Sequence, residues 1–152
     1  MSVYEEPLAR ATYAPAMTES SPDRAVNTEI APADIAAPAA NYAHAVVTDG
    51  ATRWLHTSGV VPVTAGGIVP HDVGDQARIV WANIAAMLRD AGFVPADIVS
   101  VTTYVVVGEE LAPVMAARDA ALGGHRAAST LVTVPALARP EWKVEVAIVA
   151  AR

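Results

Sequence analysis

The last 26 residues of the chain, 127–152, carry the pattern that most limits how this sequence can fold. Two runs rich in β-branched residues, 129–134 and 142–150, are separated by a segment that contains Pro135 and Pro140. β-Branched residues favour strands and prolines interrupt them, so the pattern predicts two adjacent strands joined by a turn segment.

The second run also predicts which residue to examine for chemistry. One face of this strand is purely apolar, and the other carries Lys143, Glu145 and Ala147. A carboxylate within so apolar a strand is costly to bury unless it has partners. Glu145 is therefore interpreted either as a general base that orients water or as an interface residue paired with Lys143 or a histidine.

Two helices are predicted upstream. The first covers 72–91, because Asp72 can cap its start and Gly92 stands where a left-handed residue ends a helix. The second covers 109–122, with Pro113 in its first turn and Gly123-Gly124 after its end. The apolar residues of the first helix recur on one stripe, which lets it cover a sheet.

Further strands are expected at 43–47, 53–59 and 98–107, the last being the central one from its apolar composition. The first two are joined by the turn residues Asp49-Gly50, and 60–69 contains a turn before another short strand. The order ββ(β)αβαββ predicts an α+β fold, a mixed sheet with both helices on one face. Residues 1–27 are interpreted as an N-terminal extension and 28–152 as the domain.

Alternation along the strands predicts an unusual second sheet face. It carries polar and aromatic side chains, namely Trp54, His56, Ser58, Ser100, Thr102, Tyr104 and Glu145. A face of this composition suits an interface between subunits that encloses a polar pocket.

Composition supports an oligomer and argues against other classes. Hydrophobic residues make up 53% of 152 residues, yet no apolar run reaches the ~20 residues of a membrane helix, so burial between subunits is expected. The net charge of −6, without a basic run, argues against nucleic-acid binding. The N-terminus lacks a basic region followed by an apolar stretch, which predicts no secretory signal and a cytoplasmic location.

Several kinds of site find no support in the sequence. There is no cysteine, and the four histidines show no metal-ligand spacing. No phosphate-binding loop is present, so neither a metal nor another cofactor is predicted. Ser129-Thr130 lacks the Gly-x-Ser-x-Gly context of a serine hydrolase.

Six segments, in order, resemble the YjgF/Rid family of reactive-intermediate imine and enamine deaminases. They are NYAHAV (41–46), LHTSG (55–59), QARIVWANIAAMLRDAG (76–92), DIVSVTTYV (97–105), GGHRAASTLVTVPAL (123–137) and RPEWKVEVAIVA (139–150). The resemblance covers about three quarters of the chain. It implies a chorismate-mutase-like ββαβαββ fold and a homotrimer with a barrel-like core and pockets between subunits.

The resemblance also implies site residues. The family's deaminases use a tyrosine ahead of the first strand, a serine-glycine pair after the next, and a glutamate in the last strand. Tyr42, Ser58, Gly59 and Glu145 occupy these positions. By this resemblance Glu145 and Tyr42 are the catalytic residues, and Ser58 and Gly59 contact the substrate.

Two further family positions differ here. The asparagine of the second helix is replaced by Met115, and the arginine of the penultimate strand by Ser129, or by Ala128 if a gap is allowed. Met115, Ser129 and Thr130 are then expected to line the substrate site. Since the arginine grips a substrate carboxylate, its loss argues against the usual α-amino-acid imines, unless Arg118 or Arg126 substitutes for it.

The sequence therefore predicts a hydrolase or deaminase that acts on a small imine, enamine or related intermediate. Glu145 would orient and deprotonate water, Tyr42 would cover or protonate the leaving nitrogen, and Ser58 and Ser129 would hydrogen-bond the substrate. The alternative is a non-catalytic trimer of the same fold that binds a small metabolite. Ribonuclease activity, associated with some relatives, is disfavoured by the acidic charge.

Overall fold

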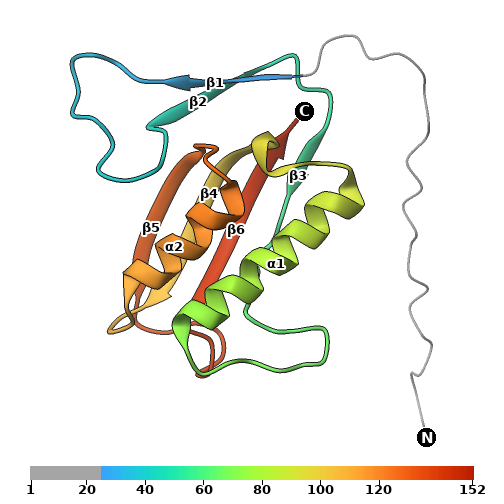
Figure 1. Ribbon diagram of the computed structural model, residues 1–152, viewed down its shortest axis with the longest axis vertical. Helices are drawn as coiled ribbons and strands as arrows, with labels where there is room; N and C mark the ends of the chain where they lie inside the picture. The colour runs from blue at the N-terminus through green and yellow to red at the C-terminus, as the bar shows by residue number, and fades with distance from the viewer. Residues whose placement is uncertain (1–24) are drawn as a thin grey trace, which may run out of the picture.

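The computed structural model describes residues 25–152 and confirms an α+β fold. The elements are β1 (Val26–Ile30), β2 (Ala45–Asp49), β3 (Trp54–His56), α1 (Val73–Ala91), a 3₁₀ turn (Pro95–Asp97), β4 (Ile98–Val106), α2 (Leu111–Leu122), β5 (Ala128–Val134) and β6 (Val144–Ala151). Both helices lie on the same face of the main sheet, as predicted (Figure 1). Of the predicted extension 1–27, residues 1–24 lie outside the described residues.

The main sheet has four strands in the order β3-β6-β4-β5, with β4 and β5 parallel and the other pairs antiparallel. The predicted central position of β4 is confirmed. The prediction that the last two strands are adjacent is wrong, because β4 lies between β5 and β6. The most apolar strand pairs with both of them, and the segment 135–143 passes from one side of β4 to the other.

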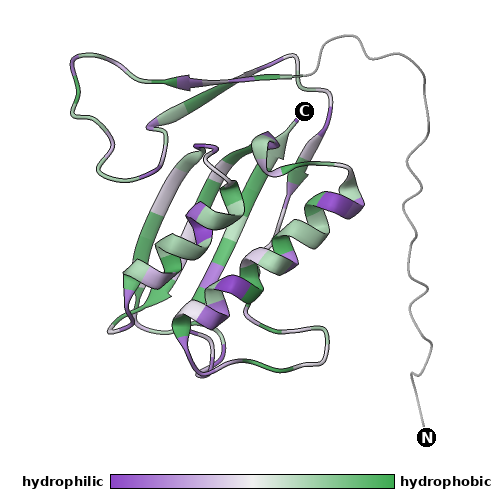
Figure 2. Cartoon of the chain, viewed as in Figure 1, coloured by the Kyte–Doolittle hydropathy of each residue, from purple (hydrophilic) through white to green (hydrophobic). Residues whose placement is uncertain are grey.

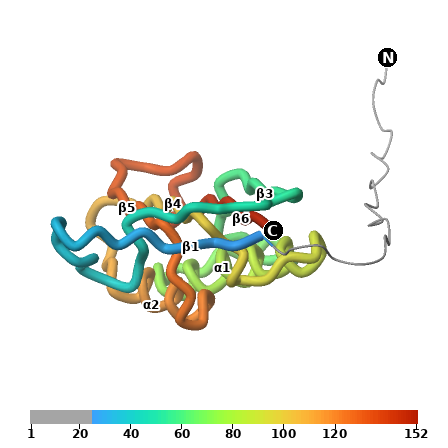
Figure 3. Tube along the Cα trace, turned by 90° about the horizontal axis from the view of Figure 1, so that it is seen from above, coloured from blue at the N-terminus to red at the C-terminus, as the bar shows by residue number. Residues whose placement is uncertain are grey.

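The pairing predicted for the first strands is also wrong. β2 pairs with β1, from Val26↔Asp49 to Ile30↔Ala45, whereas β3 pairs with β6. β1 was not predicted because VNTEI has little alternation, and its first two residues belong to the predicted extension. Figures 1 and 3 show β1 and β2 lying side by side across the end of the main sheet where β6 ends. Asn27 Nδ2 donates to the Ala151 carbonyl there (3.2 Å).

The segment 60–69 forms no strand. Val60 makes an isolated bridge with Val146, and the segment then turns. The Ile68 carbonyl accepts from Thr64 N (2.9 Å), and Gly67, at a φ of 79°, donates to the Thr64 carbonyl. The expected turn is present, therefore, without the expected strand.

Both helix ends follow the sequence signals. Asp72 Oδ1 accepts from the Asp75 amide (2.9 Å), and Gly92 ends α1 in the left-handed region at a φ of 75°. α2 begins at Leu111, has Pro113 in its first turn, and is followed by Gly123 at a φ of 58°. Within residues 25–152, neither helix has the length and hydropathy that crossing a membrane requires.

The core lies between the helices and the inner face of the sheet. Its fully buried side chains come from β4, β6 and α1 and include Val80, Ile84, Val101, Val105, Val144, Val146 and Ile148. Figure 2 shows the hydrophobic colouring of these strands. We call the opposite side of the sheet the open face; it carries the predicted Trp54, His56, Ser100, Thr102, Tyr104 and Glu145.

Candidate functional site

Glu145 and Gly59 are in direct contact. Glu145 lies on the open face of β6, half-buried and directly opposite Tyr104 of β4. A Cβ atom on residue 59 would stand 1.7 Å from Glu145 Oε1, far closer than non-bonded atoms approach. Glycine is therefore required at position 59 by the space that the carboxylate occupies, and the two predicted site residues are brought together by the fold.

A β-bulge produces this contact. His56 pairs with Val149 and Val60 bridges Val146, so three residues (57–59) face two residues of β6 (147–148). Thr57 N donates to the Ile148 carbonyl (3.1 Å), and Ile148 N donates to Thr57 Oγ1 (3.0 Å). The extra residue redirects the backbone of 57–59 and sets Ser58-Gly59 beside the last strand.

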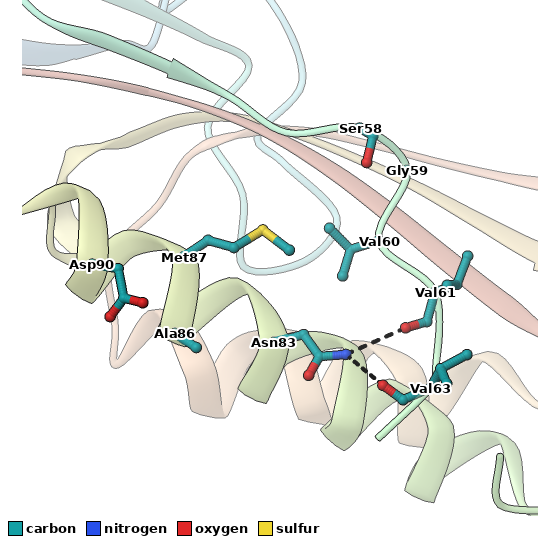
Figure 4. Close-up of a pocket in the computed structure, with 9 residues that line it drawn as sticks. All are labelled: Ser58, Gly59, Val60, Val61, Val63, Asn83, Ala86, Met87 and Asp90. Atoms are coloured by element: carbon teal, nitrogen blue, oxygen red, sulfur yellow. Dashed lines mark hydrogen bonds between the residues drawn. The ribbon is translucent and has the colours of Figure 1, made fainter. Parts of the chain in front are cut away.

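A cavity of about 420 Å³ lies between this bulge and α1 (Figure 4). Its lining residues are Ser58, Gly59, Val60, Val61, Val63, Asn83, Ala86, Met87 and Asp90. Figure 4 shows Ser58 and Gly59 across the cavity from the α1 residues, and Asn83 bound to the carbonyls of Val61 and Val63. The cavity is mostly apolar with a few polar groups, as in sites for small molecules. Glu145 is not among its lining residues.

Tyr42 lies at the opposite edge of the sheet. The next residue, Ala43, bridges Ala128 on the outer side of β5, and Arg126 Nη2 donates to the Tyr42 carbonyl (2.7 Å). Ala128 is two strands across and four residues along from Glu145, on the order of 16 Å between Cα atoms from strand geometry. One chain therefore does not bring Tyr42 to Glu145.

Ser129 does not share a face with Glu145. It pairs with the inward-facing Val101, and Arg118 Nη1 donates to its hydroxyl (3.4 Å) from α2. Its neighbours Ala128 and Thr130 pair with residues of the open face. Of the two positions aligned with the family's arginine, only Ala128 lies on the Glu145 side of the sheet.

Met115 lies in the helix layer. It is half-buried within α2, which covers the sheet face opposite Glu145. The described chain thus groups Ser58, Gly59 and Glu145, places Thr130 farther along the same face, and leaves Tyr42, Met115 and Ser129 elsewhere.

Sequence reasoning missed the residues that α1 contributes to the cavity. Asn83 interrupts the apolar stripe formed by Val80, Ile84 and Met87, and a polar side chain in that position is a usable signal. Tyr104 was expected on the open face but not as the cross-strand neighbour of Glu145, since strand register is not readable from one strand alone. Within residues 25–152, no cluster of His, Cys, Asp or Glu is arranged to hold a metal ion.

Comparison with known proteins gives consistent matches. The family model described as endoribonuclease L-PSP matches residues 33–152. YyfB from Yersinia pestis, described as a Rid-family protein of unknown function, is 34% identical, covers 83% of this chain and 98% of its own, and has a TM-score of 0.75. Curated proteins gave no match.

Two structures from E. coli are similar over almost their whole length. The YjgF gene product is 32% identical, with a TM-score of 0.61, and covers 82% of this chain and 98% of its own. TdcF, whose crystal structure contains bound serine, is 26% identical, with the same coverage and a TM-score of 0.61.

Proposed function

This chain belongs to the YjgF/Rid family, whose model is described as endoribonuclease L-PSP, and from that premise we propose that it hydrolyses the C=N bond of a small reactive imine, or of the imine to which an enamine tautomerises. The observation that carries the proposal is the Glu145 carboxylate, seated against Gly59 on the open face. No other residue of the described chain donates a hydrogen bond to it or forms an ion pair with it. Its oxygens can therefore accept a proton from a substrate water.

The proposed reaction uses that carboxylate as a general base. Glu145 takes a proton from water as the oxygen bonds to the imine carbon, and the former C=N electron pair takes up a proton at nitrogen. The resulting carbinolamine collapses to a carbonyl compound and an amine or ammonia, while the hydroxyl proton passes to the leaving nitrogen. Ser58 hydrogen-bonds the substrate, and Tyr42 supplies the proton to nitrogen. The proton taken up by Glu145 then returns to the Tyr42 oxygen by way of water, which restores both groups.

The contacts of the arginines favour a substrate without an α-carboxylate. Ala128 has no donor to offer such a group, and Arg126 is engaged with Glu29 (2.9 Å) and the Tyr42 carbonyl. Arg118 is buried and bound to Asp119 (2.8 Å) and Ser129. Neither arginine supplies the free bidentate fork that carboxylate recognition uses, so neutral imines are the proposed class.

We propose further that the site is assembled between subunits of a homotrimer. Trp54 is 53% exposed and Val132 39% exposed on the open face, where a second copy would cover them. Tyr42 and Glu145 stand too far apart within one chain to act together, so a neighbouring copy must supply one of them. No cofactor, membrane or nucleic acid enters the proposal, and a cytoplasmic location stays a prediction from the sequence.

The test is turnover of a neutral imine generated in place by oxidation of a simple amine. Wild-type protein should speed formation of the carbonyl product, and Glu145→Gln should abolish the effect while keeping the fold. Turnover that survives Glu145→Gln would contradict the mechanism. Binding without turnover would favour the alternative, a metabolite-binding trimer, for which the cavity beside Ser58 is the supporting observation.

A further inference from the structure

We propose that Gln76 and Asn83 of α1 are positioning residues that hold the Gly59–Glu145 pair from its two sides. The catalytic role of the Gly59–Glu145 pair rests on the proposed function. The way in which the pair is held rests on the contacts of α1. The two residues are seven apart, two helical turns, and therefore lie on one face of α1. Each binds backbone that leads directly to one member of the pair.

Gln76 holds the side of Glu145. Its side chain is fully buried, and Nε2 donates to the carbonyls of Pro70 (2.7 Å) and Glu141 (2.8 Å). Its Oε1 accepts from the backbone N–H of Lys143 (2.8 Å), two residues before Glu145. One amide thus joins the loop before α1 to the loop that leads into β6.

Asn83 holds the side of Gly59. Its Nδ2 donates to the Val63 carbonyl (3.0 Å) and, at the long limit of a hydrogen bond, to the Val61 carbonyl (3.4 Å). Val61 follows Gly59 by two residues, and the bulge at 57–59 leads straight into this segment. Figure 4 shows the Asn83 side chain pointing from α1 toward both carbonyls.

Filling the core does not by itself explain why these two positions are polar. Val80 and Ile84, on the same stripe of α1, are fully buried and apolar, and apolar side chains there would fill the core more cheaply. The two amides instead satisfy backbone groups on both sides of the bridge between Val60 and Val146. Displacing a reacting group by about 1 Å can lower the rate on the order of 10²-fold. One rigid helix that fixes the positions of both Gly59 and Glu145 therefore favours catalysis.

The test compares Gln76→Met and Asn83→Leu, which keep side-chain size and remove the hydrogen bonds, with Arg78→Met as the control. Arg78 lies on α1 with its side chain 64% exposed and forms an ion pair with Asp75 of the same helix. Amide hydrogen exchange is the readout independent of activity. Gln76→Met should speed exchange at Lys143, and Asn83→Leu at Val60, each about ten-fold or more, with the amides of β4 unchanged.

Imine hydrolysis is the second readout. Each of the two substitutions should lower kcat at least about ten-fold with little change in KM, and should have no further effect in a Glu145→Gln background. Exchange that rises uniformly, or effects that add to Glu145→Gln, would overturn the inference. If wild-type protein hydrolyses no imine, the proposed function fails, while the exchange pattern still decides whether the two amides hold the pair. If Gln76→Met does not fold, the half-buried Asn83 carries the same test alone.

Discussion

The Glu145 carboxylate fills the space beside Gly59 in which any other side chain would begin. Gly59→Ala should therefore displace Glu145, because the bridge between Val60 and Val146 prevents the backbone from receding. We expect a loss of imine hydrolysis on the order of 10²-fold and a destabilisation of about 1–3 kcal/mol. Steady-state kinetics and urea unfolding measure the two effects.

Gly66→Ala is the matched control for this substitution. A Cβ at Gly66 would have Thr64 Oγ1 at 3.9 Å as its nearest neighbour, which is ordinary contact. Adding Glu145→Ala to Gly59→Ala should recover stability without recovering activity. A fully active Gly59→Ala protein would show that Glu145 can serve the reaction from another position.

The C-terminal residue is predicted to stabilise the end of α1. Arg53 Nη2 donates to the Ala91 carbonyl (2.7 Å) and Arg152 Nη1 to that of Gly92, and both guanidinium groups stand over Phe93 at 5.1 and 5.9 Å. Cations there offset the helix dipole and bind the aromatic face. Arg152→Ala should lower the free energy of unfolding by about 1 kcal/mol.

Arg89→Ala is the comparison for that measurement. Arg89 is also in the last turn of α1, but its side chain is 73% exposed, and its ion-pair partner within residues 25–152 is the adjacent Asp90. In chemical unfolding, Arg89→Ala should lower the free energy of unfolding by much less than Arg152→Ala does. Equal losses would mean that charge near the helix end, rather than contact with Phe93 and the carbonyls, accounts for the stabilisation.

Local signals explain which parts of the fold the sequence predicted. Asp72, Gly92 and Gly123 act within a few residues of the helix ends they define, so both helices could be placed closely. Strand pairing is a contact between distant segments, and nothing in residues 129–150 indicates that β4 inserts between the last two strands.

The same distinction holds for the candidate site. Glu145 stands out because a carboxylate interrupts an apolar strand, which is visible locally. The face on which Ser129 lies depends on its register with Val101, and its contact with Arg118 depends on how α2 packs. The contact between Gly59 and Glu145 needs a bulge that no residue type announces, so it appeared only with the structure.

The open face is predicted to be the surface through which three copies associate. Trp54→Glu places a charge there and should convert a trimer into a monomer, since a buried unpaired carboxylate is costly. Light scattering at micromolar concentration measures the mass. Ile68→Glu is the control, because Ile68 is 66% exposed in a turn away from the sheet. A wild-type monomer would remove the shared site from the proposal.

Nucleic-acid binding is predicted to be absent despite the name of the family model. The chain has a net charge of −6, and phosphate contacts require clustered lysine and arginine. Fluorescence anisotropy with a labelled single-stranded RNA should show no binding at micromolar protein near physiological salt. Tight binding that weakens steeply with salt, or cleavage of the RNA, would mean that the surface charge has been misinterpreted.

The last prediction concerns the position that an arginine occupies in the family's amino-acid-imine deaminases. Wild-type protein should be poor on 2-iminopropionate, and Ala128→Arg should gain activity on it, because residue 128 lies on the open face. Ser129→Arg should gain nothing and lose stability, since its guanidinium would enter the layer where Arg118 is already buried. The formation of pyruvate by the three proteins measures the difference.

The same variant also tests how the site is assembled. Residue 128 lies on the order of 16 Å from Glu145 within one chain. An arginine at 128 and Glu145 can therefore act on the same substrate only if they come from neighbouring copies. The gain should therefore disappear in Ala128→Arg/Glu145→Gln and also in a monomeric Ala128→Arg/Trp54→Glu. Mixing Ala128→Arg/Glu145→Gln with wild-type protein, each poor on 2-iminopropionate by itself, under conditions that exchange subunits restores activity only if the glutamate and the arginine act from different chains. A gain that persists in the monomer would mean that a single chain holds the complete site.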